Sequence, residues 1–454
     1  MLFQWISWIR KGMQRLLLED NAGEELPVSD KMRQAVELWS DIYRQEAPWL
    51  SEDGVYGLEV AGVLASELAR MVTVEMKSRL TGPRGDLLND SYQQLLGQIR
   101  TVTELACAKG GVCFKPYLSQ GRIRIDWVPA EEFLPLSYDS NGQITGAAFL
   151  SRLKQGRSIF NKIEMHYQKD GQYYVENRVY RARSESELGR EAALTDVPQW
   201  AELAPITCLS GIRHPLFSYF KMPFANCVDE DSPLGVSVFA RAVSLLEQAD
   251  RQYSRLLWEF EGGELAIDAS ADALRYDGKH PAGTLPKTRD RLFRGLALEG
   301  GDGGDFYQVF SPELRDSSLI RGLNEILIRI EDVCGFARGT VSHIDDETIR
   351  TATELKAMKQ RTYALVRDTQ KSLQGALEGL VAAMDELADL YQMGSEGECH
   401  ISFDFDDSVV CDREQEFAEK RQLVADGIMQ PWEFRAWYFG EDEATAKART
   451  VSSL

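Results

Sequence analysis

The side chains able to do chemistry in this chain are scattered, and few of them come close together in the sequence. The densest group of metal-ligand types lies near the C-terminus and consists of Cys399, His400, Asp404, Asp406, Asp407 and Cys411. A zinc site needs four ligands at characteristic spacings, and the cysteines and histidine of this group lack a fourth. The aspartates could hold a divalent ion, but an acidic strand end explains them more simply. We therefore expect no metal site.

Sequence motifs that carry catalysis are also missing. The chain has no G-x-x-x-x-G-K-[ST], G-x-S-x-G or H-E-x-x-H motif and no dinucleotide-binding fingerprint, and its five histidines stand singly. The glycine-rich run 300–305 lacks the lysine and the following helix of a phosphate-binding loop. Seven scattered cysteines without a C-x-x-C pair indicate reduced thiols in a cytoplasmic compartment. We expect neither an enzyme nor a cofactor.

Two groups of basic residues are the remaining candidates for function. The net charge of −20 excludes a general basic surface for nucleic acid, because phosphate binding needs clustered lysine and arginine. Between Leu274 and Gly295, however, six basic residues stand against two acids, and these are Arg275, Lys279, Lys287, Arg289, Arg291 and Arg294. This run is either a solvated turn region or a contact for an acidic partner.

The second basic group lies on a predicted long helix that begins near Asp345 and continues to about Tyr391. Lysine and arginine without an intervening acid share one face of this helix, at Lys356, Lys359, Arg367 and Lys371. A functional contact is one interpretation of this face. The other is a solvated face, or salt bridges to a neighbouring surface.

Two long helices and a module between them are the elements expected to position these groups. Apolar residues at helical spacing predict a helix over 233–261, roughly 43 Å long at 1.5 Å per residue. A second helix over 312–335 would be roughly 35 Å long and end at its glycine. The intervening residues have strand-like segments at 265–268, 291–298 and 306–310. We expect a helical pair with a small module at its tip, although an ordinary αα-hairpin also fits.

One tryptophan of the first long helix lies outside its apolar stripe. Trp258 shares its face with Glu247, Arg251 and Arg255. Because a large aromatic side chain is rarely left in water, we predict that Trp258 lies in a contact between subunits.

The other elements predict an α+β fold, with helices before strands in residues 1–230. We expect helices at 58–80 and 90–110, and a strand at 401–405 followed by short helices broken at two glycines. Period-two patterns predict antiparallel strands at 112–117, 122–127, 145–153, 163–168 and 173–180. The turn at Gln120-Gly121 joins the first two strands, and Lys169-Asp170-Gly171 joins the last two as a hairpin. The aromatic-rich segment 1–20 favours a docking helix over a membrane-surface helix, and no run is long enough to span a bilayer.

Four short motifs give the chain a family resemblance. They are SPLGVSVF at 232–239, LLEQAD at 245–250, GTVS at 339–342 and TATE at 351–354. With these motifs in this order, the chain resembles the portal proteins of tailed bacteriophages, in the family that includes portals of siphophages of Gram-positive hosts. The resemblance runs from about residue 32 to 446, and the short C-terminus departs from some relatives.

The resemblance implies a helix-rich portal fold that assembles as a ring, usually of twelve copies. The parts that it implies are a wing (1–232), a first stem helix (233–262), a clip (263–311), a second stem helix (312–335), a tunnel loop (336–350), a long wing helix and strand (351–405) and a helical crown (406–454).

Function and partners are implied in the same way. Double-stranded DNA would enter and leave the capsid through the ring, while the large terminase and later a head-completion adaptor dock on the clip. The ring would sit at one capsid vertex of the virion, with the major capsid or scaffolding protein around it, after assembly in the host bacterial cytoplasm. The implied channel residues are Arg338, Thr340, Ser342, His343, Arg350, Lys356 and Lys359. The implied docking residues of the clip are Arg275, Lys287, Arg289, Arg291 and Arg294.

Two other classes of protein stay open at this point. One is a capsid-associated or scaffolding protein that forms rings without passing DNA. The other is a hydrolase whose site is assembled from scattered carboxylates.

Overall fold

A computed structural model describes nine ranges and two single residues of the chain: 27–184, 187–263, 266–270, 293–296, 307–344, 352–394, 397, 399–405, 413–439, 441 and 443–451. For the strands between 266 and 310 and for residues 352–359, 413–416, 419 and 451, it describes the backbone alone. The predicted docking helix at 1–20 and most of the basic run at 275–294 lie outside the described residues.

Helices and strands follow the mixed order expected of an α+β chain. The α-helices are α2 (Asp30–Tyr43), α3 (Val60–Thr73), α4 (Gly85–Leu96), α5 (Ile99–Lys109), α6 (Val243–Gly262), α7 (Asp316–Cys334), α8 (Ala352–Leu390), α9 (Arg413–Ala425), α10 (Pro431–Phe439) and α11 (Glu443–Val451). Short 3-10 turns are formed by Pro48–Ser51, Ala130–Glu132, Leu194–Asp196 and Ala240–Ala242. The predicted fold class is confirmed.

The strands of the described residues form four sheets. They are β1 (Met76–Thr81), β2 (Gly111–Ser119), β3 (Arg122–Pro129), β4 (Phe133–Tyr138), β5 (Ile144–Gln155), β6 (Ser158–Lys169), β7 (Gln172–Ala182), β8 (Arg190–Ala192), β9 (Ile206–Leu209), β10 (Ser218–Lys221), β11 (Ala266–Ser270), β12 (Phe293–Leu296), β13 (Tyr307–Phe310) and β14 (His400–Phe405). Their orders are β1-β14, β10-β2-β3, β12-β11-β13 and β4-β5-β6-β7-β8, with β9 also paired to β7.

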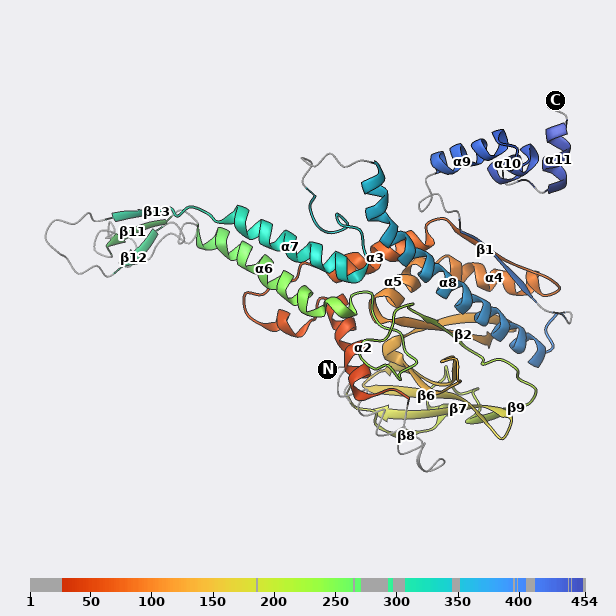
Figure 1. Cartoon of the computed structure of the whole chain (residues 1–454). Helices are drawn as coiled ribbons and strands as arrows, with labels where there is room; N and C mark the ends of the chain where they lie inside the picture. Colours follow the sequence, from red (N-terminus) through yellow and green to blue (C-terminus); the bar gives the residue numbers. More distant parts are fainter. Residues whose placement is uncertain are drawn as a thin grey trace, which may run out of the picture.

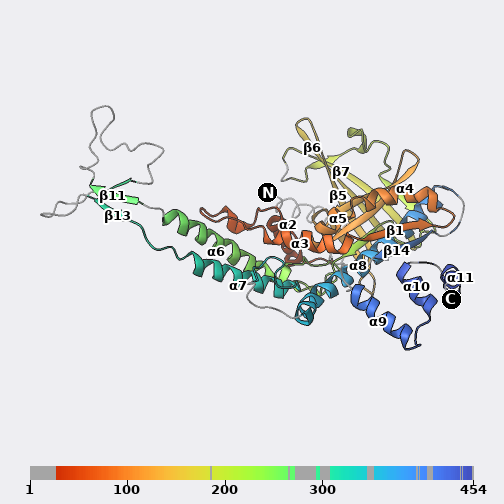
Figure 2. The ribbon, with the colours of Figure 1, turned by 90° about the horizontal axis from the view of Figure 1, so that it is seen from above.

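The molecule has a thick body from which a two-helix rod projects. Figure 1 shows α6 and α7 side by side, with the β11–β13 sheet at the far end of the rod. The view from above in Figure 2 shows the same projection, with α9, α10 and α11 as a separate cluster on the body's other side. Helices α5 and α8 both pack against β2. The main core extends from this packing through α2 and α3 to the inner ends of the rod helices.

Local turn chemistry explains the two hairpins that the sequence predicted. At the β2–β3 turn Gln120 and Gly121 have φ values of 50° and 69°, and at the β6–β7 turn Asp170 and Gly171 have 52° and 74°. Two consecutive left-handed residues match the twist of antiparallel strands. The expected strands of both hairpins are therefore confirmed, as are the expected strands at the tip of the rod.

The predicted helix at 58–80 was wrong in its second half. Helix α3 ends at Thr73, and Met76–Thr81 forms strand β1, paired with β14 from Met76↔Phe405 to Thr81↔His400. Pairing with a strand that is remote in sequence overrides the local helical signal. The predicted helix at 90–110 is likewise two helices, because α4 ends at Leu96 and α5 begins at Ile99.

The first rod helix begins at Val243, not at Pro233. Residues 232–239 are buried and outside any helix, the 3-10 turn Ala240–Ala242 follows them, and the Val238 N–H donates to the Cys107 carbonyl at the end of α5, at 2.9 Å. A Cβ on Gly235 would lie 2.1 Å from the Gly110 carbonyl oxygen, so only glycine allows this close approach. With 20 residues, α6 is about 30 Å long rather than 43 Å.

The second rod helix is also shorter at its start. Helix α7 begins at Asp316, after a non-helical stretch in which Arg315 binds Glu259 of α6. Its end agrees with the prediction, because Gly335 has φ 83° and serves as a left-handed C-cap.

Candidate functional site

The rod helices are tied together near their outer ends by a charged pair. Glu259 accepts from the Arg315 main-chain N–H at 3.0 Å, and from its Nε and Nη2 atoms at 3.1 and 2.7 Å. The hydrogen bonds from Arg315 lower the pKa of Glu259 to about 2. A fork of this kind fixes orientation as well as distance, so it defines how α6 and α7 meet below the β11–β13 sheet.

Large apolar side chains remain exposed on this rod. Trp258 is 65% exposed, and Ile320 of α7 is 49% exposed. Phe260, Leu314 and Val333 add further exposed apolar surface. Trp258 therefore takes no part in the packing of α6 on α7, as its place outside the apolar stripe predicted. Its contact with another subunit stays a prediction.

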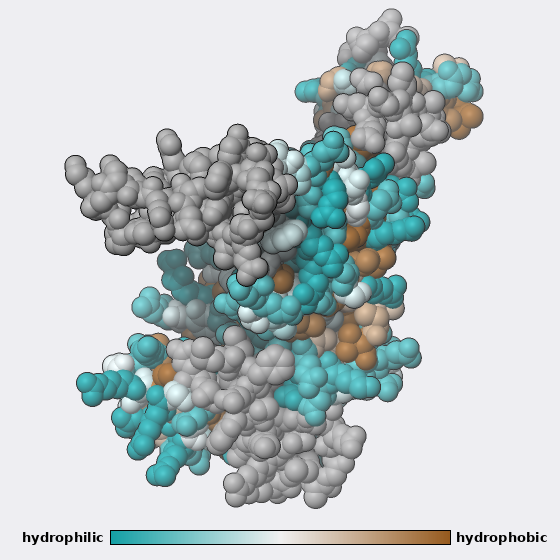
Figure 3. Space-filling model, turned by 90° about the vertical axis from the view of Figure 1, so that its left-hand side faces the viewer, coloured by the Kyte–Doolittle hydropathy of each residue, from teal (hydrophilic) through white to brown (hydrophobic). Residues whose placement is uncertain are grey.

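Viewed along the rod from its tip, the described surface is mostly hydrophilic and is broken by isolated hydrophobic side chains (Figure 3).

Exposed basic side chains include Arg367 and Lys371 on α8, with the exposed acid Asp368 beside them in sequence. Lys356 and Lys359 lie in the described backbone of the first turns of α8, whereas Arg350 lies outside the described residues.

The segment that follows α7 folds back along that helix. Glu331, fully buried in the penultimate turn of α7, accepts from the Val341 and Ser342 main-chain N–H groups at 2.6 and 2.8 Å. It also accepts from the Ser342 hydroxyl at 2.6 Å and from the Gly339 N–H at 3.2 Å. We call Glu331 with Gly339, Val341 and Ser342 the Glu331 clamp.

Further contacts hold the same segment on both sides. Asn324 of α7 donates to the His343 carbonyl at 3.0 Å and accepts from its N–H at 2.7 Å. The Ala337 N–H donates to the Thr362 hydroxyl of α8 at 2.7 Å. Residues 336–343 are therefore fixed to both helices. Gly339 serves this folded turn, because its φ is 92° and a Cβ on it would lie 2.4 Å from Ile344.

A small charged group marks the exposed side of this loop. Arg338, with a side chain 50% exposed, contacts Asp332 at 2.9 Å, and Arg361 of α8 lies 3.7 Å from the same carboxylate. The hydrogen bond from Arg338 is the main cause that lowers the pKa of Asp332. Two arginines thus share one carboxylate, while Glu325 and Glu331 also act on Arg338.

The channel residues predicted from the sequence differ in how far they are exposed. Arg338 and His343 are exposed, Thr340 is half-buried and donates to the Ala337 carbonyl, and Ser342 is buried against Glu331. Of the predicted docking residues, Arg294 lies in the backbone of β12, opposite Asp268 of β11. Arg275, Lys287, Arg289 and Arg291 lie outside the described residues. The roles of all these residues stay predictions.

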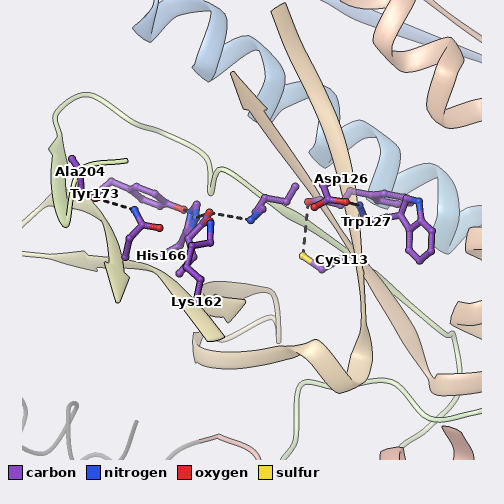
Figure 4. Close-up of polar contacts among 11 residues, drawn as sticks. Cys113, Asp126, Trp127, Lys162, His166, Tyr173 and Ala204 are labelled. Carbon is purple, nitrogen blue, oxygen red and sulfur yellow. Dashed lines mark hydrogen bonds and ion pairs between the residues drawn. The ribbon is translucent and has the colours of Figure 1, made fainter. Parts of the chain in front are cut away.

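A buried polar network inside the body was not predicted from the sequence. Glu164 of β6 lies 3.1 Å from the Lys115 ammonium of β2, 2.7 Å from that of Lys162 and 3.0 Å from His166 Nε2. His166 Nδ1 lies 2.9 Å from the Tyr173 hydroxyl. Tyr173, His166 and Lys162 gather on strands of the five-strand path β4–β8 (Figure 4). The network joins that sheet to the β10-β2-β3 sheet.

Burial and charge act in opposite directions on this network. Burial alone would raise the pKa of Glu164, but Lys115, His166 and Lys162 hold it well below its usual value. Burial lowers the pKa of His166, against the opposing effect of Glu164. When the His166 imidazole is neutral and donates from Nε2 to Glu164, its Nδ1 must accept a hydrogen bond from the Tyr173 hydroxyl. The same hydroxyl oxygen accepts from the Leu216 N–H at 3.1 Å.

The described part of the chain offers neither a metal site nor a membrane span. There, no three His, Cys, Asp or Glu side chains come close enough together to hold a metal ion. None of the helices described combines the length and the apolar content that crossing a bilayer requires. Cys411, Asp406 and Asp407 of the metal alternative lie outside those residues.

Comparison with known families decides the identity of the chain. The family model described as "Phage portal protein, SPP1 Gp6-like" matches residues 98–449, which is more than three quarters of the sequence. The chain belongs to this phage portal family. The family resemblance drawn from the sequence motifs is thereby confirmed, and the chain is a portal protein.

Two solved structures are similar to this portal protein over nearly its whole length. One is titled "Neck of native GTA particle computed with C12 symmetry", with 12% identity, a TM-score of 0.39, and coverage of 94% of this chain and 98% of the other. The other is titled "Virion of native gene transfer agent (GTA) particle", with 12% identity, a TM-score of 0.41, and coverage of 93% and 97%. No curated protein matches the sequence significantly.

Proposed function

We propose that this portal protein assembles into a ring whose central channel passes double-stranded DNA into and out of a capsid. The observation that carries the proposal is the projecting rod of α6 and α7, in a chain of the portal family, with exposed apolar side chains that its own packing does not use. Trp258 and Ile320 would bury against neighbouring copies, because isolated large apolar groups on a two-helix rod gain most from a second copy of the same rod.

The parts of the ring follow the divisions expected from the resemblance. The wing would comprise residues 1–232, the stem 233–262 and 312–335, and the clip 263–311. The tunnel loop would be 336–350, the long wing helix and strand 351–405, and the crown 406–454. Twelve copies is the number that the resemblance implies.

The proposed DNA path passes the inner end of the stem. Arg338 and Arg361, which share Asp332, and the lysines at 356 and 359 would offer each subunit a few positive charges. A ring multiplies these charges, and brief phosphate contacts need only a few per subunit. The net charge of −20 supports passage without retention, because an acidic ring does not hold the DNA that it passes.

Partners are proposed on the same basis. The clip would bind the large terminase during packaging and a head-completion adaptor afterwards. The wing would contact the major capsid or scaffolding protein at one vertex of the virion, after assembly in the bacterial cytoplasm. No catalytic role and no cofactor is proposed for this chain.

The test combines assembly with DNA passage. Electron microscopy and native mass spectrometry of the purified full-length protein should find closed rings with a central hole, and capsids that lack the protein should contain no packaged DNA. A compact monomer at micromolar concentration would contradict ring formation. Rings together with normal DNA content in capsids lacking the protein would favour the second candidate, a capsid-associated ring that does not pass DNA.

A further inference from the structure

The Glu331 clamp has the form of an anion site that the chain fills with its own carboxylate. Three main-chain N–H groups and one hydroxyl converge on the two oxygens of Glu331, at 2.6 to 3.2 Å. The carboxylate is fully buried, so water cannot replace these donors if they are lost. Charge-assisted hydrogen bonds are about twice as strong as neutral ones, which makes the clamp a rigid contact.

The clamp joins residues that are close in space because the chain reverses at Gly335. Glu331 lies one turn before that reversal, and its donors lie 8 to 11 residues further along the chain. Asn324, about two turns earlier in α7, then holds His343 by a pair of hydrogen bonds. The segment 339–343 is thus attached to the last three turns of one stem helix.

We propose that Glu331 is a positioning residue that makes residues 339–342 move as one body with the inner end of α7. The inference rests on the proposed function, because it concerns the loop placed there in the channel. A shift of the stem helix would carry the loop with it, so the width of the channel would change when the stem moves. Glutamine in place of Glu331 keeps the shape but loses the charge, and it turns an NH2 group toward N–H donors.

The first test measures main-chain hydrogen exchange in purified full-length protein by mass spectrometry with fragmentation to single residues. In E331Q, the amides of Val341 and Ser342 should exchange about 10- to 100-fold faster than in the wild type, and the Gly339 amide, which also donates to the Ser342 hydroxyl at 3.1 Å, by a smaller factor. The matched control is E325Q, which changes an exposed glutamate of the same helix. Unchanged protection at these amides in E331Q would overturn the proposal.

Two milder variants keep the test decisive if E331Q does not fold. S342A removes the hydroxyl donor and leaves the carboxylate with its main-chain partners, so it should speed exchange at residues 339–342 by a smaller factor. N324A removes the other contact and should release His343 while Val341 stays protected. Equal release of both positions in N324A, or no release in S342A, would contradict a clamp centred on Glu331.

DNA content separates this inference from the function on which it rests. Particles assembled with E331Q or S342A should form with intact rings and retain a different amount of DNA from the wild type, and E325Q should not change it. Faster exchange with normal DNA content would support the clamp and contradict the place of the loop in the channel. Normal exchange with altered DNA content would contradict the clamp and leave the channel function supported.

Discussion

Trp49 donates from its indole Nε1 to Asp250 Oδ2 at 2.8 Å, across 201 positions of the sequence. The other oxygen of Asp250 accepts from the Leu58 N–H, also at 2.8 Å. One buried carboxylate of α6 therefore holds two points, Trp49 and Leu58, of the segment that leads from α2 to α3, and this contact attaches that segment to the inner half of α6.

We expect D250A to lower the free energy of unfolding by about 2–4 kcal/mol, because it leaves the buried N–H donor of Trp49 and the partly buried one of Leu58 without a partner. Urea unfolding followed by tryptophan fluorescence measures this loss. Q248A, at an exposed position two residues away, is the matched control and should stay within about 0.5 kcal/mol of the wild type. Equal stability of D250A and Q248A would show that the contact does not hold the segment.

The buried His166 predicts a loss of stability in acid. Its pKa in the folded protein lies below the ordinary value of 6.5, so the unfolded chain takes up the proton first. Stability from this residue is present above about pH 6.5 and is lost as the pH falls below it. Glu164, whose folded pKa is also lowered, continues the loss below its ordinary value of 4.5.

The measurement compares urea unfolding at pH 7.5 and 5.5 for the wild type and H166Q. H166Q should have a lower free energy of unfolding than the wild type at pH 7.5, but this free energy should fall less between pH 7.5 and pH 5.5. The comparison cancels other groups, such as Glu37, whose pKa burial raises to about 7. H214Q changes an exposed histidine and should keep the wild-type slope. If the free energy of unfolding changes with pH as much in H166Q as in the wild type, the network does not titrate in this range.

Trp258 predicts an effect on assembly without an effect on the subunit. Because it is 65% exposed, W258A should change the stability of the isolated subunit by less than about 0.5 kcal/mol. Native mass spectrometry should nevertheless detect rings that dissociate at a higher protein concentration or close with a different copy number. Rings of unchanged mass and unchanged thermal stability would remove Trp258 from the subunit contact.

The basic run at 275–294, in the proposed clip, predicts partner binding that depends on charge. Reversal of Arg289, Arg291 and Arg294 to glutamate should leave ring formation intact and abolish the pull-down of the terminase or the adaptor. Wild-type binding should weaken as salt is raised, because exposed charges are screened. Binding by the triple variant at physiological salt would show that the run is a solvated loop.

The first turns of α8 predict an effect on DNA. K356E combined with K359E should leave capsids assembled and lower the amount of DNA packaged or retained, because phosphate contacts are lost around the whole ring. If these lysines instead bridge to acids of a neighbouring subunit, purified rings of the double variant should fall apart in native mass spectrometry. Intact rings with normal DNA content would contradict both interpretations.

Signals carried by a few adjacent residues predicted much of the fold from the sequence. Gln120-Gly121 and Asp170-Gly171 located two hairpins because left-handed turns need such residues. Gly335 located the end of α7, and the continuous helical pattern before Tyr391 located the end of α8. These elements could be predicted because their causes lie within one turn of the chain.

Elements whose causes lie far away in the sequence could not be predicted. Residues 76–81 read as helix until β14 is present to pair with them, and Pro233 has the features of a helix start although the segment that follows binds the end of α5. The clamp was missed for the same reason. In the sequence, Glu331 beside the apolar Ile330 has the pattern of an ordinary solvated residue. Its hydrogen-bond donors come from residues 339–342, which reach it only because the loop folds back.

The pairing of β1 with β14 also governs when the subunit can finish folding. Thr81 leaves the ribosome some 320 residues before its partner His400, so the two-stranded sheet closes only when nearly the whole chain has been made. Contacts this distant in sequence form late and slowly, because the intervening loop must first be ordered. A nascent chain therefore has an unpaired β1 edge for most of its synthesis, and a truncated product keeps it. By this geometry, only a chain that extends to at least Phe405 can pair its β1 edge completely.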